Sequence, residues 1–270
     1  MSQFSSIRAA AIQMVSTPDV TENLATAERL IAQVAAAGAA LAVLPEYFAI
    51  MGRRDTDKLA VAETFGGGLI QDALARMAAK YRIWLAAGTL PLKCDDPGRV
   101  RNSLLVYGPD GKNVARYDKI HLFGFDNGSE RYCEADTIEP GNVPVAFDTP
   151  FGRVGLAVCY DLRFPEFFRA LGRVDVLLLP AAFTATTGRA HWETLIRARA
   201  IENQCFVVAS GQGGLHPTGR ETWGHSMLVD PWGLVLDCLP QGEGVVMAEL
   251  KASQLERVRK TLPALDHRVM

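Results

Sequence analysis

No disulfide framework and no zinc-ligand spacing is present in this sequence. The five cysteines, at positions 94, 133, 159, 205 and 238, are odd in number, lie far apart and include no Cys-x-x-Cys pair. This pattern excludes a small secreted scaffold stapled by disulfides, and it predicts a reducing, cytoplasmic location. It also predicts no metal site.

Long apolar runs and an excess of charge of one sign are absent as well. The longest apolar stretch, about residues 35–44, is too short to span a bilayer, and residues 1–6 lack the pattern of a signal peptide. A net charge of −2 leaves no basic footprint for nucleic acid or for an anionic membrane. With 270 residues, of which 49% are hydrophobic, the chain is long enough for the core of a soluble enzyme.

Three short motifs carry possible chemistry. Cys159 ends an apolar, strand-like run in GLAVCYDLRFPE (155–166), where the Pro-Glu pair indicates a helix start. Glu46 follows the apolar run of LAVLPEY (41–47), and Lys119 lies among aromatic and apolar neighbours in RYDKIHLF (116–123). Each has an ordinary alternative: a small core cysteine, a solvated loop acid and a surface lysine.

Taken together, the three side chains form a chemical set. A glutamate can accept the proton of a thiol, a lysine can stabilise a thiolate and an oxyanion, and a cysteine can form an acyl intermediate. In this order the three contexts resemble the nitrilase (carbon–nitrogen hydrolase) superfamily with its Glu-Lys-Cys triad, over nearly the whole chain. The resemblance also implies that Glu134, a few residues before Pro140-Gly141, is a second active-site carboxylate; its alternative is a surface acid in a loop.

An internal repeat predicts the fold. The run ALAVLP (40–45) is echoed by DVLLLP (175–180), and the turn GPDG (108–111) is echoed by DPWG (230–233). We read two β-α-β-α-β-β halves, each a mixed sheet with helices on one face. The resemblance implies that they pack as a four-layer α-β-β-α sandwich. Residues 1–250 form the predicted single domain, and residues 251–270 a tail at a homodimer interface, as in relatives.

The repeat predicts the elements and places the site. The expected helices are 21–37, with Thr21 as a possible N-cap, then 70–81, 165–171, 190–204 and 253–261; one expected strand covers 83–90. Because ligands of α/β proteins bind beyond the carboxyl ends of strands, the three motif residues can converge on one rim between the halves. The ammonium of the lysine is expected to lower the pKa of the thiol, and burial to lower the pKa of the lysine.

Substrate contacts are predicted from the segments beside the motifs. Arg163 can pair with a substrate carboxylate, as the matching arginine does in ω-amidase-type relatives, or form an ion pair with Asp161 or Glu166. The backbone N–H of Tyr160 can hold the oxyanion. The hydroxyl-rich loop after 175–179 brings three further candidates, which are Phe183, Thr184 and Thr187. The loop 124–133 can shape substrate choice, and His121 and His225 are expected to be structural.

The resemblance implies hydrolysis of a small carboxylate-bearing amide to the acid and ammonia through a cysteine thioester, without metal or organic cofactor. Tyr160-Asp161 after the cysteine differs from the Trp-Glu of true nitrilases and favours amides over nitriles. Residues 190–202 and 224–233 look most similar to the deaminated-glutathione amidase branch. The alternatives are an ω-amidase acting on α-ketoglutaramate or succinamate, a carbamoylase, and, from another class, a non-catalytic amide-binding protein.

Overall fold

Two mixed β-sheets form the centre of the computed structural model, which describes residues 4–128 and 131–269. The expectation about the N-terminal segment falls partly on residues 1–3, and that about the loop 124–133 partly on 129–130; these residues and 270 lie outside the described part. None of the helices in the described ranges has the length and apolar content needed to cross a membrane.

The first sheet takes its central strands from the first half of the chain. Its members in spatial order are β15 (Gly244–Leu250), β1 (Ile7–Gln13), β2 (Leu41–Val43), β3 (Trp84–Ala86), β5 (Val100–Tyr107) and β4 (Leu90–Lys93), with β6 (Asn113–Asp118) also paired to β5. The pairs β1–β2 and β2–β3 are parallel, whereas β3–β5 and β5–β6 are antiparallel.

The second sheet repeats this order. Its members are β14 (Val235–Leu239), β13 (Ser226–Val229), β12 (Phe206–Gly211), β11 (Val176–Ala181), β10 (Gly152–Leu156) and β9 (Ala146–Thr149). Two parallel pairs are again followed by two antiparallel pairs. The internal repeat predicted from the sequence is therefore confirmed, with β15 and β9 added as antiparallel neighbours of β1 and β10.

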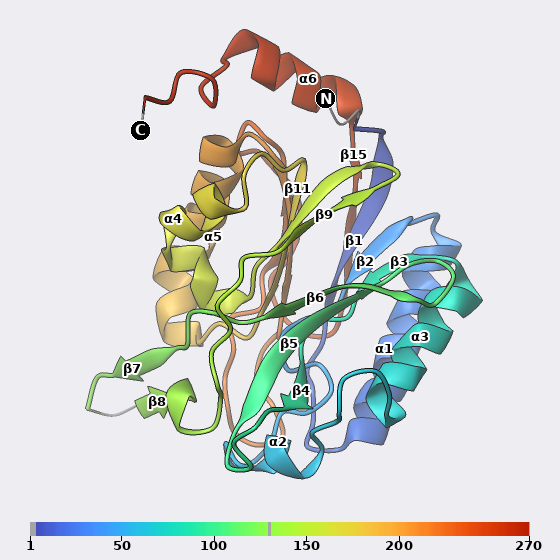
Figure 1. Ribbon diagram of the computed structural model, residues 1–270, viewed down its shortest axis with the longest axis vertical. Helices are drawn as coiled ribbons and strands as arrows, with labels where there is room; N and C mark the ends of the chain where they lie inside the picture. The colour runs from blue at the N-terminus through green and yellow to red at the C-terminus, as the bar shows by residue number, and fades with distance from the viewer. Residues whose placement is uncertain (1–3, 129–130, 270) are drawn as a thin grey trace.

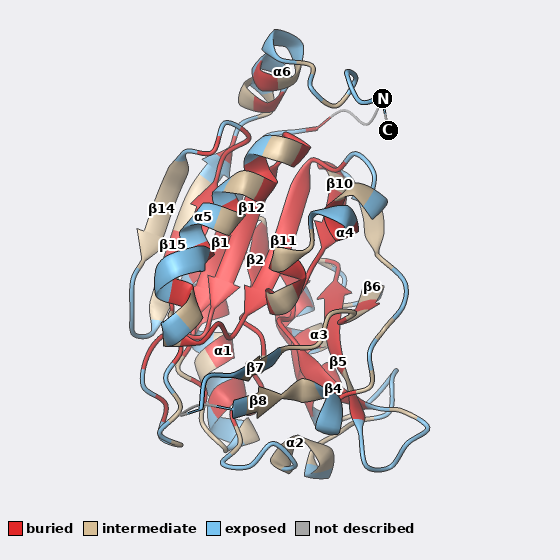
Figure 2. Ribbon diagram, turned by 90° about the vertical axis from the view of Figure 1, so that its left-hand side faces the viewer, coloured by how far each residue is buried: buried red, intermediate tan, exposed pale blue. Residues whose placement is uncertain are grey.

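The helices cover the outer faces of the two sheets. Helices α1 (Val20–Ala36) and α3 (Leu69–Tyr81) lie on one side, and α4 (Pro165–Ala170) and α5 (Ala185–Asn203) lie on the other, as Figure 1 shows. Figure 2 shows the strands buried between helices whose outward faces are exposed. The smaller elements are α2 (Asp57–Ala60), the hairpin β7 (Gly124–Asp126) and β8 (Arg131–Cys133), and the 3-10 helices η1 (Glu134–Asp136) and η2 (Cys159–Arg163).

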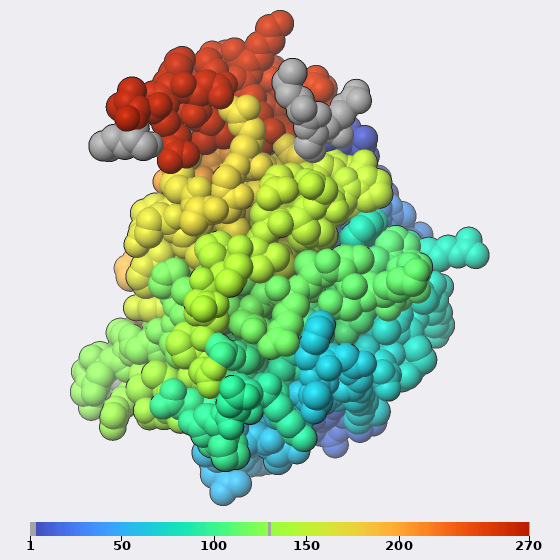
Figure 3. Space-filling model, viewed as in Figure 1, coloured from blue at the N-terminus to red at the C-terminus, as the bar shows by residue number. Residues whose placement is uncertain are grey.

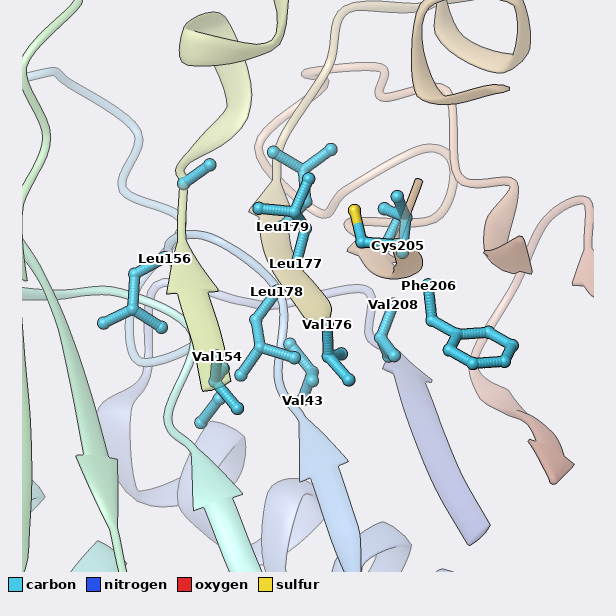
Figure 4. Packing of buried hydrophobic residues seen from close by; sticks show 14 of the residues in the cluster. Val43, Val154, Leu156, Val176, Leu177, Leu178, Leu179, Cys205, Phe206 and Val208 are labelled. Atoms are coloured by element: carbon cyan, nitrogen blue, oxygen red, sulfur yellow. The ribbon is translucent and has the colours of Figure 1, made fainter. Parts of the chain in front are cut away.

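Strands buried on both faces explain the continuous apolar runs. In β1, Ala9 and Ala11 belong to the core between the sheets, while Ala10 and Ile12 belong to the core under α1 and α3. Successive side chains of a strand point to opposite faces, so both sets must be apolar when helices and a second sheet cover them. Figure 4 shows Val43 of β2 beside Val176 and Leu178 of β11, in the layer where the sheets meet.

Several element boundaries differ from the prediction. Helix α1 is capped by Asp19 rather than Thr21, because the Asp19 carboxylate accepts the backbone N–H groups of Thr21 and Glu22. The predicted strand 83–90 is interrupted, and β4 begins only at Leu90. Gly88 causes the break: its φ is +57°, and a Cβ there would lie 2.0 Å from the carbonyl oxygen of Pro45.

The C-terminal segment packs on its own chain. Helix α6 (Ala252–Thr261) buries Leu255 and Val258, and its Arg259 pairs with Asp175 at 2.7 Å. Figure 3 shows this segment, in red, forming one end of the molecule. Leu262 and Val269 remain exposed, at 47% and 95%.

Candidate active site

Cys159 occupies a strained backbone position at the start of η2, three residues after the end of β10. Its φ is +48°, in the left-handed region that residues with a Cβ rarely adopt. The chain leaves the sheet at Ala157, whose N–H still bonds to Leu178, and then turns sharply into η2. Strain of this kind costs about 1–3 kcal/mol and persists only where the surroundings fix it. The thiol is consequently held at one place, with its residue only 7% exposed.

A buried carboxylate fixes this turn. Asp161 accepts the backbone N–H of Val158 at 2.8 Å, the Tyr117 hydroxyl at 2.7 Å and the His121 Nδ1 at 2.7 Å. The His121 ring also stacks on Phe164. His121 therefore has a structural role, as the sequence predicts. His225 likewise bonds through its ring to a backbone carbonyl, that of Trp223.

A buried lysine bridges two carboxylates. The Lys119 Nζ lies 2.9 Å from Glu46 Oε1 and 2.7 Å from Glu134 Oε2, and its side chain is 0% exposed. The bridging lysine directly follows β6, whereas Glu46 follows β2 and Glu134 begins η1. Three separate segments thus bring one positive and two negative charges together.

Further hydrogen bonds fix both carboxylates. Glu46 accepts the Asn102 side-chain amide at 2.9 Å and the backbone N–H of Ala182 at 2.8 Å. Glu134 accepts the Tyr47 hydroxyl at 2.6 Å and the backbone N–H of Phe123 at 2.7 Å. Donors from four different segments therefore fix the orientation of the two acids.

The electrostatics differ from the expectation. Burial raises the pKa of the Cys159 thiol well above its ordinary value, the charge of Glu46 raises it further, and Lys119 lowers it only in part. Burial acts to lower the pKa of Lys119, but the two carboxylates outweigh it and the pKa is raised. Burial opposes ionisation of Glu134 as well, yet Lys119 holds the pKa of that carboxyl below its usual value. Both contributions that the sequence predicts are present, but the pKa of each group is raised, because burial dominates at the thiol and the two carboxylates together outweigh burial at the lysine.

Seven of the predicted site residues line one pocket of about 290 Å³. They are Glu46, Glu134, Cys159, Tyr160, Phe183, Thr184 and Thr187. Lys119 is not among the lining residues; it contacts Glu46 and Glu134, which are. The hydroxyl-bearing residues are not in a loop as expected: helix α5 begins at Ala185, and Thr184 is its N-cap, accepting the backbone N–H of Thr187.

Arg163 lies at the edge of this pocket. Its guanidinium group is over the rings of Tyr160 and Phe183, at 5.6 and 5.2 Å, and Nη1 is 3.1 Å from the ring nitrogen Nδ1 of His191. Within the described part of the chain it pairs with neither Asp161 nor Glu166. Among the described residues the cation therefore has no acidic partner, and it lies beside two residues that line the pocket.

Four residues of the site were missed by the sequence analysis. Tyr47, Asn102 and Phe123 support the two carboxylates, and Arg220 lines the pocket from the loop before β13. Tyr47 could have been found, because it directly follows Glu46. Nothing local marks the other three, since their role depends on contacts between distant segments. Over the described residues, no three His, Cys, Asp or Glu side chains are grouped to hold a metal ion.

The chain is similar to known proteins in both sequence and structure. The family model for carbon-nitrogen hydrolases matches residues 8–260. The deaminated glutathione amidase of Synechocystis sp. is 42% identical over 267 residues, which is 97% of each chain. The crystal structure of the C. elegans NitFhit protein matches with a TM-score of 0.90 at 36% identity, covering 98% of this chain and 66% of that longer one.

A second solved structure bears on the thiol. It is a mutant of the amidase from Nesterenkonia sp. AN1, and it shows the result of Michael addition of acrylamide at the active-site cysteine. It matches with a TM-score of 0.79 at 26% identity, over 95% of this chain and 98% of that one.

Proposed function

The chain belongs to the carbon–nitrogen hydrolase family, and from this premise we propose that it hydrolyses the amide of deaminated glutathione through a thioester on Cys159. It is an amidase of the nitrilase superfamily, whose members use an active-site cysteine. The observation that carries the proposal is one thiol enclosed in a pocket with two carboxylates that a buried lysine bridges. The choice of substrate is supported by the relative in Synechocystis.

In the proposed acylation step, Glu46 accepts the thiol proton as sulfur attacks the amide carbonyl. The new carbon–sulfur bond produces a tetrahedral oxyanion, which the Lys119 ammonium and the backbone N–H of Tyr160 stabilise. Collapse breaks the carbon–nitrogen bond, and Glu46 returns its proton to the departing amine. Because the raised pKa keeps the resting thiol protonated at neutral pH, this proton transfer accompanies the attack.

In the proposed deacylation step, water attacks the thioester while Glu46 accepts one of its protons. The carbon–sulfur bond breaks, the acid leaves, and the proton returns to the Cys159 sulfur. Glu134 acts through Lys119: its two oxygens lie 2.9 and 2.7 Å from the lysine nitrogen and hold the ammonium in place. We therefore assign Glu134 as a positioning residue.

The leaving group follows from the structure of the substrate. Deaminated glutathione has a ketone in place of the α-amine of glutathione, and its side-chain amide joins the keto acid to cysteinylglycine. Hydrolysis of that amide releases 2-oxoglutarate and the amine of cysteinylglycine, rather than the ammonia expected for a primary amide. The acyl arm carries one carboxylate, for which the Arg163 guanidinium beside Tyr160 and Phe183 is the proposed partner.

Product release by the purified protein tests this proposal. We expect 2-oxoglutarate from deaminated glutathione at a higher kcat/KM than from α-ketoglutaramate, and no product from a simple nitrile. Cys159→Ala should abolish turnover while its melting temperature stays near that of the wild type. A preference for α-ketoglutaramate or succinamate would identify an ω-amidase. Release from none of these would overturn the substrate assignment and direct the search to carbamoyl compounds or to a binding role.

We further propose a homodimer in which the tail 251–270, beyond a domain of residues 1–250, lies at the interface. The exposed Leu262 and Val269 support this. Light scattering on the intact chain should give twice the mass of the monomer. The double variant Leu262→Glu, Val269→Glu should give the mass of one monomer. Val143→Glu, at a position 62% exposed elsewhere, is the control.

A cytoplasmic location is proposed on the ground that all five cysteines are free. Fractionation of the source cells tests it, and recovery of the protein outside the cytoplasm would contradict it.

A further inference from the structure

The pocket at Cys159 continues outward into a second, larger hollow. The two share Tyr47, Phe123, Glu134 and Arg220, and the outer one has a volume of about 530 Å³. Its remaining lining includes Arg54, Asp55, Lys58 and Tyr132. A ligand whose reacting carbonyl lies at the thiol therefore has room to extend past Glu134 into the outer hollow.

Arg220 is a cation with an unused hydrogen-bond donor. Its Nε is buried and has no hydrogen-bond partner among the described residues, and its guanidinium group is 5.3 Å from the centre of the Tyr132 ring. Within residues 4–128 and 131–269 no carboxylate lies within ion-pair distance of it. A buried donor without an acceptor is unfavourable, and a planar guanidinium suits a carboxylate in a two-pronged contact.

Lys58 faces the same hollow. Its Nζ bonds to the Thr137 hydroxyl at 3.0 Å and lies 5.6 Å from the centre of the Tyr47 ring, and it too forms no ion pair in the described part of the chain. Burial lowers the pKa of Lys58, Asp55 and Glu134 raise it, and the positive charge of Arg220 lowers it. Two cations that line one hollow attract an anion more strongly than either does alone.

The remaining charges of the hollow are already committed. Arg54 pairs with Asp57 at 3.1 Å, and Glu134 pairs with Lys119 at 2.7 Å. Of the ionisable side chains that line the hollow, three are positive, namely Arg54, Lys58 and Arg220, and two are negative, namely Asp55 and Glu134. Lys58 and Arg220 are the two of these cations for which no ion pair is found in the described part of the chain.

We infer that Arg220 and Lys58 form a subsite for the carboxylate carried by the leaving amine. This inference rests on the proposed function, because deaminated glutathione has carboxylates on both sides of its scissile amide. Arg163 is on the side of Tyr160 and Phe183, and the two cations of the outer hollow are on the side of Tyr47 and Glu134. With the amide at Cys159, the acyl arm thus extends toward Arg163 and the amine arm toward Arg220 and Lys58.

A matched pair of substrates tests the subsite. Deaminated glutathione is compared with its glycinamide analogue, which keeps the scissile amide and the thiol but lacks the terminal carboxylate. For the wild type we expect a KM about 10- to 100-fold lower for the carboxylate form with a similar kcat, as loss of a charged hydrogen bond from uniform binding predicts. Arg220→Gln and, separately, Lys58→Gln should erase most of this difference by raising KM for the carboxylate form alone.

Arg189→Gln is the control, because it also removes an arginine lying over an aromatic ring, that of Trp223, but outside both hollows. It should leave the preference unchanged. Turnover of both substrates by the wild type with equal KM would overturn the subsite and leave the proposed function standing. Equal losses on both substrates in Arg220→Gln would also overturn it, since they indicate a structural role. Turnover of neither substrate by the wild type would instead refute the proposed function.

Discussion

The second strand of each half of the fold ends at the same rim, but the two ends carry different chemistry. In the first half, β2 leads through Pro45 to the carboxylate of Glu46; in the second, β11, which contains Pro180, leads directly to the backbone N–H of Ala182. The two ends meet, since that N–H donates to Glu46 at 2.8 Å. The first half and the segment after it supply the charged groups, and the second supplies the neutral thiol.

This division separates two ways of fixing a site. The charged side is held by mutual attraction, with Lys119 between two acids. The thiol side is held by backbone geometry, through a left-handed residue that Asp161 fixes in place. Changes on the charged side should therefore alter proton transfer and pH dependence, whereas changes on the thiol side should alter local order.

The largest expected effect comes from Glu46→Gln. If Glu46 is the general base as proposed, its loss should lower kcat about 10²- to 10⁴-fold. The same change should speed alkylation of Cys159 by iodoacetamide at neutral pH, because the charge of Glu46, after burial, raises the pKa of the thiol. Mass spectrometry of labelled protein measures the second effect, and Glu249→Gln at an exposed position is the control. Unchanged turnover would remove Glu46 from its assigned role.

Lys119→Met should be next, since it leaves two buried carboxylates without their partner. Breaking a buried pair typically costs about 3–5 kcal/mol of unfolding free energy. Lys80→Met, at an exposed pair with Glu28, should cost less than about 1 kcal/mol and is the matched control. Urea unfolding at pH 7 provides both values.

The pH dependence of the Lys119→Met variant should change sign. In the wild type the pKa of Glu134 is lowered, so its contribution to stability is present above about pH 4.5 and is lost only as the pH falls through the folded-state value. Without the lysine, only the hydrogen bonds from Phe123 and Tyr47 oppose burial, which is the largest influence on this carboxyl, so we expect its pKa to rise above the unfolded one. The unfolding free energy of the variant should then decrease from pH 5 to 8. Over the same range the contribution of Glu134 to the unfolding free energy of the wild type is constant. Equal slopes of unfolding free energy against pH in the variant and the wild type would contradict the pairing of Glu134 with Lys119.

Asp161→Asn tests the thiol side. Its amide cannot accept from the Val158 N–H, Tyr117 and His121 as the carboxylate does, and a buried group left unsatisfied costs about 1–3 kcal/mol. We expect this loss of stability together with a lower kcat, because the turn at Cys159 relaxes. Asp148→Asn, at a side chain 75% exposed, should change neither quantity.

The smallest effect compares two helix caps. Thr184→Ala and Asp19→Ala should each lower the unfolding free energy by about 0.5–2 kcal/mol, since each removes an N-cap acceptor. Only Thr184 lines the pocket, so only its replacement should change KM. A change of KM in both variants would mean that stability, rather than contact with substrate, sets the effect.

The repeat and the three motifs were predictable because they depend on local patterns. Apolar strands buried on both faces appear in the sequence as short runs, and Glu46, Lys119 and Cys159 each follow such a run or lie close to its end. The hairpin β7–β8 and the start of α5 were missed: a hydroxyl-rich segment resembles a loop, although Thr184 is also a good N-cap. Arg220 was missed because its role comes from Tyr132, which lies 88 positions earlier (220 − 132).

The pairing of β1 with β15 has a consequence for biosynthesis. Ile7 pairs with Leu250 and Gln13 with Gly244, so the strand made first obtains one of its two neighbours last. Until about residue 250 has left the ribosome, the run AAAI (9–12) has an unpaired edge, which is a template for association with other chains. At about 5–20 residues per second this lasts for many seconds. Slow synthesis of the last third should therefore lower the yield of folded protein, and chaperones that cover apolar edges should restore it.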